Sequence, residues 1–263
     1  MHRYALRLEY DGAGFVGWQR QENGLSVQEL LERAASRLAG GQPVASTVAG
    51  RTDAGVHAEG QVAQIDLPGA FAPETLRDAL NFHMLPYPVV VLQAATVAPE
   101  WNARFSAVGR AYRYLILNRR ARAALAAGRA WHIERQLDAE AMHAAAQTLL
   151  GRHDFTSFRA AACQARSPLR TLDRLDVRRE GAFVVVEAEA RSFLHHQVRN
   201  MVGTLKLVGE GRWSADAVRQ ALEARDRSAA GPTAPPEGLC LTAVRYEADP
   251  FQEVQAGVDS AEV

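Results

Sequence analysis

The sequence predicts an α+β fold made of two similar halves. Short segments that alternate apolar and polar residues, as half-buried strands do, are separated by segments with helical periodicity. Their order runs strand, helix, strand, helix, strand, and then strand, helix, strands, helix, helix, strand. With 263 residues, 48% of them hydrophobic and 23% charged, the chain has the length of one large domain or two ordinary ones and enough apolar material for a core.

The strand signal is clearest in five segments, each of which alternates apolar with polar residues. These segments are residues 4–10, 61–67, 111–117, 183–190 and 240–246. No strong internal sequence repeat accompanies them, so the expected symmetry of the two halves rests on the order of the elements.

The helix signal is clearest over residues 26–38. This segment begins with Ser26-Val-Gln-Glu29, a capping box in which both end side chains satisfy free backbone N–H groups, and it stops at Gly40. A second helix is predicted over residues 138–150, with Asp138 as N-cap and a glycine as its stop. Further helices are expected over residues 73–83, 194–208 and 214–226.

Composition places the protein among soluble globular proteins. The chain holds no apolar run of membrane-spanning length, and its first residues lack the apolar region of a signal peptide, so we expect a cytoplasmic location. Cys163 and Cys240 stand far apart and are expected to be reduced structural thiols. Proline and glycine predict an exposed loop over residues 228–238, and residues 251–263 are expected to form a loose acidic tail.

Charge is balanced overall but unevenly distributed. The 30 basic and 30 acidic residues cancel, whereas residues 104–135 hold eight arginines and the single acid Glu134. A positive stripe is therefore possible on a neutral molecule.

A glycine motif, Gly12-Ala-Gly-Phe-Val-Gly17, follows the first predicted strand and has the spacing of a dinucleotide-binding turn. That turn also requires a helix to begin within it, and here the helix signal comes only at Ser26. We therefore expect a flexible loop, whose Phe15, Trp18 and Arg20 could stack on unpaired RNA bases. A nucleotide-dependent oxidoreductase is kept as a weaker alternative.

Two other clusters carry little chemistry by spacing alone. His195 and His196 are adjacent within a predicted helix, where their side chains would point about 100° apart, so no metal site is expected. Cys163 follows His153 and Asp154 closely, but closeness in sequence says nothing of geometry, and a buried thiol is the simpler interpretation.

The segment Gly50-Arg-Thr-Asp-Ala-Gly-Val-His57 places polar groups on a glycine-hinged loop just before a strand, where binding and catalytic residues often lie. From spacing alone, an ordinary turn in which Asp53 bonds its own backbone is an equal alternative.

The same segment resembles the aspartate loop of the tRNA pseudouridine synthase A family, and the resemblance extends over residues 3–246. It is carried by motifs in the right order: Tyr10-Asp-Gly12, Gly17-Trp-Gln-Arg-Gln21, Ser26-Val-Gln-Glu29, Ala103-Arg-Phe-Ser-Ala107, Arg110-Ala-Tyr-Arg-Tyr114, Asp154-Phe-Thr-Ser-Phe-Arg159, His195-His-Gln-Val-Arg-Asn-Met-Val-Gly203 and Glu237-Gly-Leu239.

This resemblance implies the pseudouridine synthase fold, with mixed, largely antiparallel sheets flanked by helices and a central active-site cleft. We expect an N-terminal half over residues 1–105, which carries the aspartate loop, and a C-terminal half over residues 106–250. The implied activity is isomerisation of uridines in the anticodon stem-loop of tRNA, at positions thirty-eight to forty, by a homodimer that needs no metal or nucleotide cofactor.

The resemblance also implies roles for single residues. Asp53 would be the catalytic carboxylate, Tyr112 would contact the substrate, and Arg199 would pair with Asp53. Arg51 would contact the RNA, although the roles of the two arginines could be exchanged. Leu241 or Leu239 would pack beside the target uracil.

Further expectations concern the RNA. Arg20, Arg104, Arg110 and His196 are candidates to contact it, and the arginine-rich stretch would bind phosphates without reading sequence. The alternative from another class is a non-catalytic RNA-binding or chaperone protein on the same scaffold.

Overall fold

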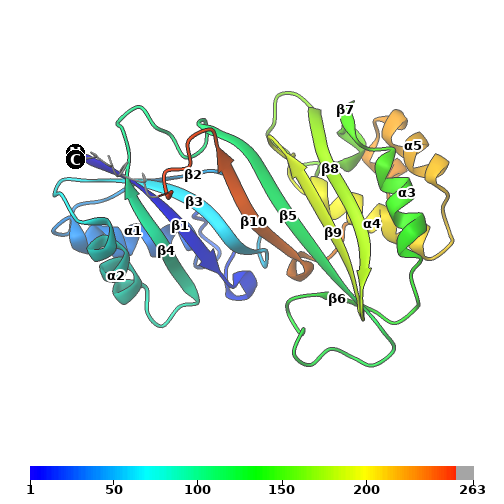
Figure 1. Ribbon diagram of the computed structural model, residues 1–263, viewed down its shortest axis with the longest axis horizontal. Coiled ribbons are helices and arrows are strands. Elements are labelled where there is room, and N and C mark those ends of the chain that lie inside the picture. The colour runs from blue at the N-terminus through cyan, green and yellow to red at the C-terminus, as the bar shows by residue number, and fades with distance from the viewer. Residues whose placement is uncertain (253–263) are drawn as a thin grey trace, which may run out of the picture.

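The computed structural model describes residues 1–252, which form a mixed α/β fold around one large sheet (Figure 1). The strands follow the order β4-β1-β3-β10-β5-β9-β8-β7, with β2 paired to β3 and β6 paired to β5. Their bounds are β1 His2–Tyr10, β2 Ser46–Val48, β3 His57–Leu67, β4 Val89–Thr96, β5 Ala107–Asn118, β6 Trp131–Ile133, β7 Gly151–Asp154, β8 Leu169–Glu180, β9 Phe183–Ala190 and β10 Leu239–Tyr246. Only β3 with β10 and β5 with β6 run parallel among these pairs, which confirms a mixed, largely antiparallel arrangement.

The two ends of the sheet are joined by its last strand. β10 comes at the end of the described chain, yet it lies at the centre of the sheet between β3 and β5 (Figure 1). Its contact with β3 is short, with Cys240 opposite His57 and Leu241 opposite Ala58. Because β3 begins directly after the aspartate loop, this pairing fixes the loop against the C-terminal strands.

Within residues 1–252, five α-helices in two groups cover the sheet. Their bounds are α1 Val27–Leu38, α2 Pro73–Met84, α3 Ala139–Gln147, α4 Gln197–Gly209 and α5 Ala215–Ala224. The predicted caps are present: the backbone N–H of Glu29 donates to Ser26 Oγ at 3.1 Å, and that of Ala141 donates to Asp138 Oδ1 at 2.9 Å. Figure 1 shows α1 and α2 at one end of the sheet and α3, α4 and α5 at the other.

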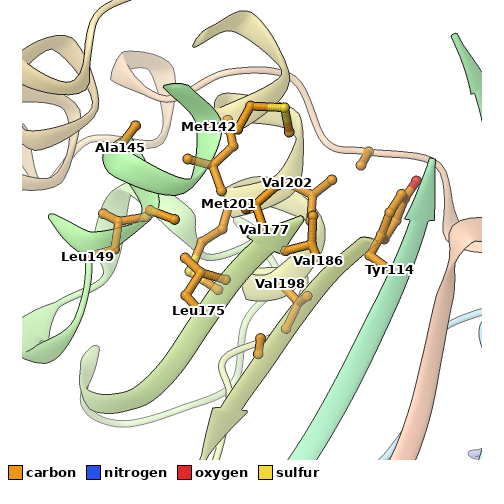
Figure 2. Packing of buried hydrophobic residues seen from close by; sticks show 14 of the residues in the cluster. Tyr114, Met142, Ala145, Leu149, Leu175, Val177, Val186, Val198, Met201 and Val202 are labelled. Atoms are coloured by element: carbon orange, nitrogen blue, oxygen red, sulfur yellow. The ribbon is translucent and has the colours of Figure 1, made fainter. Parts of the chain in front are cut away.

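Each helix group has its own hydrophobic cluster. Figure 2 shows the second cluster, in which Met142 of α3 and Met201 of α4 pack against Leu175 of β8. On β10, Leu239 belongs to this cluster, whereas Leu241 belongs to the cluster of α1 and α2. Residues two apart on a strand point to the same face. Both helix groups therefore cover one face of the sheet, and the gap between them lies over β10 and β5.

The sequence predicted the positions of most elements but missed several strands. The longest omission is β8, because a register irregularity between Leu172 and Arg174 interrupts its alternation of apolar and polar residues. The predicted helix over residues 194–208 was wrong at its start, since α4 begins at Gln197. The helix expected over residues 138–150 ends at Gln147.

The expectations for the thiols, the membrane and the acidic tail can also be compared with the structure. Cys163 and Cys240 are both free thiols. Within residues 1–252, none of the helices has the length and apolar character needed to cross a membrane. At the start of the predicted tail, the Phe251 ring lies 4.5 Å from the guanidinium carbon of Arg7. Residues 253–263 of that tail lie outside the described residues.

Candidate active site

Asp53 lies in the short loop between β2 and β3, and the neighbouring residues of this loop are tied to other elements. Tyr10 Oη and Thr52 Oγ1 are 2.7 Å apart, and the backbone N–H of Trp18 donates to the Thr52 carbonyl at 3.0 Å. Gln61 of β3 donates from its amide to the Gly50 carbonyl at 2.7 Å. The Asp53 carboxylate, 23% exposed, is therefore presented by a loop that is fastened just before it, at Gly50 and Thr52.

The glycine motif supports this loop rather than a cofactor. A Cβ on Gly12 would lie 2.1 Å from the Val56 carbonyl oxygen, and a Cβ on Gly17 would lie 2.7 Å from the Thr52 carbonyl oxygen. Gly17 also has φ +105°, which few other residues adopt. The glycines therefore let residues 12–17 lie directly against the aspartate loop, and no α-helix begins before Val27.

The expectation that this motif stacks on RNA was wrong for its aromatic residues. Phe15 and Trp18 are only 6% and 2% exposed, because both belong to the hydrophobic cluster of α1 and α2. Arg20 is exposed, and its guanidinium lies 3.1 Å from the carboxylate of Glu32.

His195 and His196 both reach Asp53, which the sequence analysis did not foresee. The Nε2 atom of His195 lies 3.2 Å from Asp53 Oδ1, and that of His196 lies 3.4 Å from Oδ2. The expectation that the two rings diverge assumed a helix through both residues. Instead His196 is the N-cap of α4 with φ 62°, a left-handed conformation, and the ring centroids are 4.1 Å apart.

Of the two candidate arginines, Arg199 is the one that lies against Asp53. Its Nη1 donates to Asp53 Oδ2 at 3.2 Å, and its Nε donates to the Ala234 carbonyl at 2.8 Å. Arg51 is exposed, on the other side of Thr52 in the loop. The guanidinium of Arg199 is thus fixed at two points, one on the aspartate loop and one on the segment that leads to β10.

The segment that holds Arg199 is partly buried, although an exposed loop was predicted over residues 228–238. A Cβ on Gly203 of α4 would lie 1.7 Å from the Pro232 carbonyl oxygen, so the segment lies directly on the helix. Thr233 donates from its hydroxyl to Asn200 Oδ1 at 2.7 Å. Ala234 is completely buried, and its carbonyl accepts the hydrogen bond from Arg199 Nε.

Burial shifts the pKa values of two groups near Asp53, His196 and Tyr112. Burial lowers the pKa of His196 below its usual 6.5, and the charges of His195, Arg199 and Arg227 lower it further, whereas Asp53 opposes the shift. Burial likewise raises the pKa of Tyr112, and the charge of Asp53 adds to that effect. His196 is therefore mostly neutral and Tyr112 fully protonated at neutral pH.

Tyr112 lies on β5 at the junction of the two hydrophobic clusters. Its ring meets Phe193 edge to face at 5.2 Å, and its hydroxyl would be 3.9 Å from a Cβ on Gly50 of the aspartate loop. The structure does not place Leu241 at the surface of the site. Leu241 is opposite Tyr112 on β10 and fully buried, and Leu239 is 5% exposed. These leucines support the strand beside Tyr112, and their burial argues against the predicted contact with the target uracil.

Arg110 is not an RNA contact, in contrast to the prediction. It is 8% exposed, and its guanidinium donates to four backbone carbonyls, those of Ala49, Arg104, Ala107 and Arg191, at 2.7, 2.9, 3.2 and 2.6 Å. Burial lowers its pKa. Ala49 precedes the aspartate loop and Arg191 precedes the two histidines, so Arg110 joins the two chain segments that build the site.

The rest of the arginine-rich stretch is mostly at the surface. Arg104 is exposed, with its guanidinium carbon 5.5 Å from the Phe105 ring centroid. Arg113 pairs with Glu59, and Arg129 lies 3.0 Å from Asp11. Exposed arginines also gather in the long loop between β5 and β6, which extends past the end of the sheet (Figure 1); they are Arg119, Arg120, Arg122 and Arg129.

Three residues of this site were missed by sequence reasoning, namely His195, Gln61 and Asn200. His195 was visible as half of a histidine pair, but its position depends on the left-handed backbone of His196, which no sequence pattern signalled. Gln61 and Asn200 are fully buried amides that bond backbone carbonyls at 2.7 Å each. A polar residue inside an otherwise apolar strand or helix was the available signal.

Comparison with known proteins shows which sequences this chain resembles. A family of sequences described as tRNA pseudouridine synthase matches residues 145–247. A tRNA pseudouridine synthase A of Acidiphilium cryptum is 72% identical over 252 residues, which cover 95% of this chain and 99% of the relative. The proteins of the same name from Rhodospirillum centenum and Gluconobacter oxydans are 61% and 57% identical, over 94% and 95% of this chain and 100% and 92% of each relative.

These similarities first define the class of protein: a pseudouridine synthase, with the mixed α/β sheet described above. The chain belongs to the tRNA pseudouridine synthase A family.

Proposed function

We propose that this protein is an isomerase that converts uridine to pseudouridine in the anticodon stem-loop of tRNA, at positions thirty-eight to forty. The observation that carries the proposal is the Asp53 carboxylate, held 3.2 Å from the guanidinium of Arg199 in the gap between the two halves. Membership of the family supports the reaction class, and the resemblance of the motifs supports the positions in the tRNA.

The reaction breaks the N1–C1′ bond of uridine, turns the uracil and forms a C5–C1′ bond. The proton on C5 leaves and N1 gains one, so no electrons are transferred to or from an outside partner. Detaching the base leaves positive charge on the ribose, and an ionised carboxylate can stabilise or trap it. Asp53 would supply that carboxylate, by attack on the sugar, by addition to the uracil ring or by assisting a glycal route.

The residues around Asp53 would have separate roles in the reaction. Arg199 orients the carboxylate, while His195 and His196 contact its two oxygens. Tyr112 would form the wall against which the uracil stacks. Burial raises the pKa of Tyr112, so its phenol keeps its proton near neutrality and can donate a hydrogen bond.

The substrate uridine must leave its stack to reach Asp53, at a cost of a few kcal/mol that is lowest in loops and near helix ends. Arg51 would contact the RNA or fill the space that the base leaves. Arg20, Arg104 and the exposed arginines between β5 and β6 would hold the phosphates. We further propose a homodimer in the cytoplasm, with one tRNA contacting both subunits and no metal or nucleotide needed for the reaction.

Release of tritium from an unmodified tRNA transcript labelled at uridine C5 tests the activity directly, because forming the C5–C1′ bond expels that hydrogen. We expect release by the unaltered protein and none by Asp53→Asn. The matched control is Asp78→Asn, since Asp78 is an exposed aspartate of α2 paired with Arg77. The control should release tritium at the unaltered rate.

Binding of the same tRNA separates catalysis from recognition. We expect folded Asp53→Asn to bind the transcript in a salt-sensitive manner. If the unaltered protein binds but releases no tritium, the non-catalytic RNA-binding function is correct instead. If Asp53→Asn is folded and has lost binding, Asp53 is a binding residue.

A further inference from the structure

Three atoms of the kind that bind transition-metal cations lie together in the gap between the halves. They are one carboxylate oxygen of Asp53 and the Nε2 atoms of His195 and His196, all within 4.8 Å of one another. Imidazole nitrogens and carboxylate oxygens are the ligands of many sites that hold zinc through three side chains and one water.

The separations agree with the coordination geometry of such a cation. Zinc lies about 2.0–2.1 Å from nitrogen and about 2.0–2.2 Å from oxygen, so two ligands of a tetrahedron are roughly 3.3–3.5 Å apart. The separations here are 3.2 Å for His195 and 3.4 Å for His196, each measured to the nearer oxygen of Asp53. A cation on Oδ1 could therefore lie between Asp53 and His195 as they stand. His196 is nearer to Oδ2, and its ring would turn toward the cation from within 4.8 Å.

The backbone holds the two rings in this position. The His195 carbonyl accepts from the backbone N–H of Ala160 at 2.9 Å, and the His196 carbonyl accepts from that of Asn200 at 2.9 Å. The left-handed φ of His196 turns its ring back beside that of His195. Their side chains are 41% and 28% exposed, so a cation can enter from solvent and keep a bound water.

Arg199 opposes a cation but leaves one oxygen to it. Its guanidinium engages Oδ2 of Asp53, whereas Oδ1 is the oxygen that faces His195. Repulsion from the guanidinium weakens metal binding, so the site should be reversible and emptied readily by a chelator.

We propose that Asp53, His195 and His196 bind a first-row transition-metal cation of the zinc or cobalt type, and that the bound cation inhibits the enzyme. The cation would occupy the carboxylate that the reaction needs. The inhibition rests on the proposed function, whereas binding of the metal does not.

Binding is tested on the purified chain with Co²⁺ alone, whose visible absorption is intense only when the ion is close to tetrahedral. Cys163→Ser/Cys240→Ser serves as the background, so that thiols are removed as ligands. We expect these absorption bands with one Co²⁺ per chain, displacement by Zn²⁺, and loss of the bands with EDTA. His195→Gln and His196→Gln should each weaken binding by roughly tenfold or more, since loss of even an outer partner of a ligand lowers metal affinity by about ten- to a hundredfold.

His83→Gln is the matched control, because His83 is an exposed histidine of α2 far from these atoms along the chain, and it should bind as the background does. Circular dichroism establishes that each variant is folded. Absence of the tetrahedral Co²⁺ bands in the folded background, or bands that survive in both folded histidine variants, would overturn the site.

The consequence for catalysis is measured by tritium release at increasing Zn²⁺. We expect Zn²⁺ to inhibit tritium release and EDTA to reverse the inhibition. In His195→Gln, a higher Zn²⁺ concentration should be needed to inhibit release to the same fraction of that variant's own metal-free rate. Metal binding without any tritium release from metal-free protein would refute the proposed function and leave the site standing. Release that Zn²⁺ leaves unchanged, in protein that binds Co²⁺, would refute the inhibition.

Discussion

The two loops that flank the gap differ in how the chain holds them. The aspartate loop over residues 49–56 is short, and it is fastened by Arg110, Tyr10, Trp18 and Gln61. The loop between β5 and β6, over residues 119–130, is longer and mostly exposed, and four of its side chains are arginines. Its tip residue Leu125 is fully exposed. We therefore expect the chemistry to depend on the position of the aspartate loop and RNA binding to depend on the charge of the longer loop.

Two arginines that look alike in the sequence illustrate the contrast. Arg110 and Arg120 both belong to the arginine-rich stretch of residues 104–135. Arg110 is buried and donates hydrogen bonds to four backbone carbonyls, whereas Arg120 is exposed. Replacing them should therefore produce different kinds of defect.

The largest effect is expected for Arg110→Met. The change removes all four hydrogen bonds of the guanidinium and leaves buried carbonyls without a donor, which should lower the free energy of unfolding by about 3 kcal/mol. The turnover number should fall too, because the backbone before Asp53 and before His195 is released. Urea unfolding and tritium release measure the two effects.

Arg104→Met is the matched control for that change, since Arg104 is exposed and should alter stability by less than about 0.5 kcal/mol. If Arg110→Met unfolds like the unaltered protein and instead binds tRNA with a weaker salt dependence, Arg110 is an RNA contact as the sequence suggested.

A smaller effect is expected when charge is removed from the loop over residues 119–130. In the triple change of Arg119, Arg120 and Arg122 to Gln, the KM for tRNA should rise about tenfold while the turnover number at saturating tRNA and the stability stay unchanged. Each lost phosphate contact makes the negative slope of log affinity against log salt shallower by about 0.7–0.9. We therefore expect the magnitude of the slope to fall by roughly 2–3 in the triple variant. Filter binding at several salt concentrations measures the slope.

An equal loss of charge on α5 and its flanks serves as the control. Arg212, Arg219 and Arg225 are exposed there, on the helix group at the end of the sheet (Figure 1). If their change to Gln lowers the slope as much as the loop variant does, net charge rather than this loop determines binding.

Much of the fold could be predicted because its signals are local. The cap at Ser26 and the alternation of β9 depend on residues close in sequence, and both elements lie where expected. The order of strands could not be predicted in this way. The two-pair contact between β3 and β10 joins His57 to Cys240 and Ala58 to Leu241, pairs that are far apart in the sequence.

The candidate site shows the same division. Asp53 and Arg199 were identified through the motifs of a family, not through spacing, because their contact spans 146 residues of sequence. Arg110 was misjudged because its burial depends on tertiary packing, and the histidine pair because one residue departs from helical backbone.

His57 connects the two loops, and changing it should have the smallest of the three effects. Its Nδ1 accepts from the backbone N–H of Gly12 at 3.1 Å and lies 3.1 Å from Asp11 Oδ1, and its Nε2 lies 2.9 Å from the Gly128 carbonyl, so the ring spans Gly12 and Gly128. His57→Gln cannot span both, and we expect a loss of about 1 kcal/mol in stability. The KM for tRNA and the turnover number should both change by a few-fold.

His132→Gln distinguishes a connection between the two loops from a loosening of the loop over residues 119–130 alone. His132 Nε2 contacts only the Arg119 carbonyl, at 2.8 Å, among the bonds of its side chain in residues 1–252. This variant should therefore raise KM and leave the turnover number alone, because nothing links it to residues 49–56. Equal turnover numbers in both variants and the unaltered protein would mean that the two loops act independently, with position supplied to Asp53 entirely from its own side of the gap.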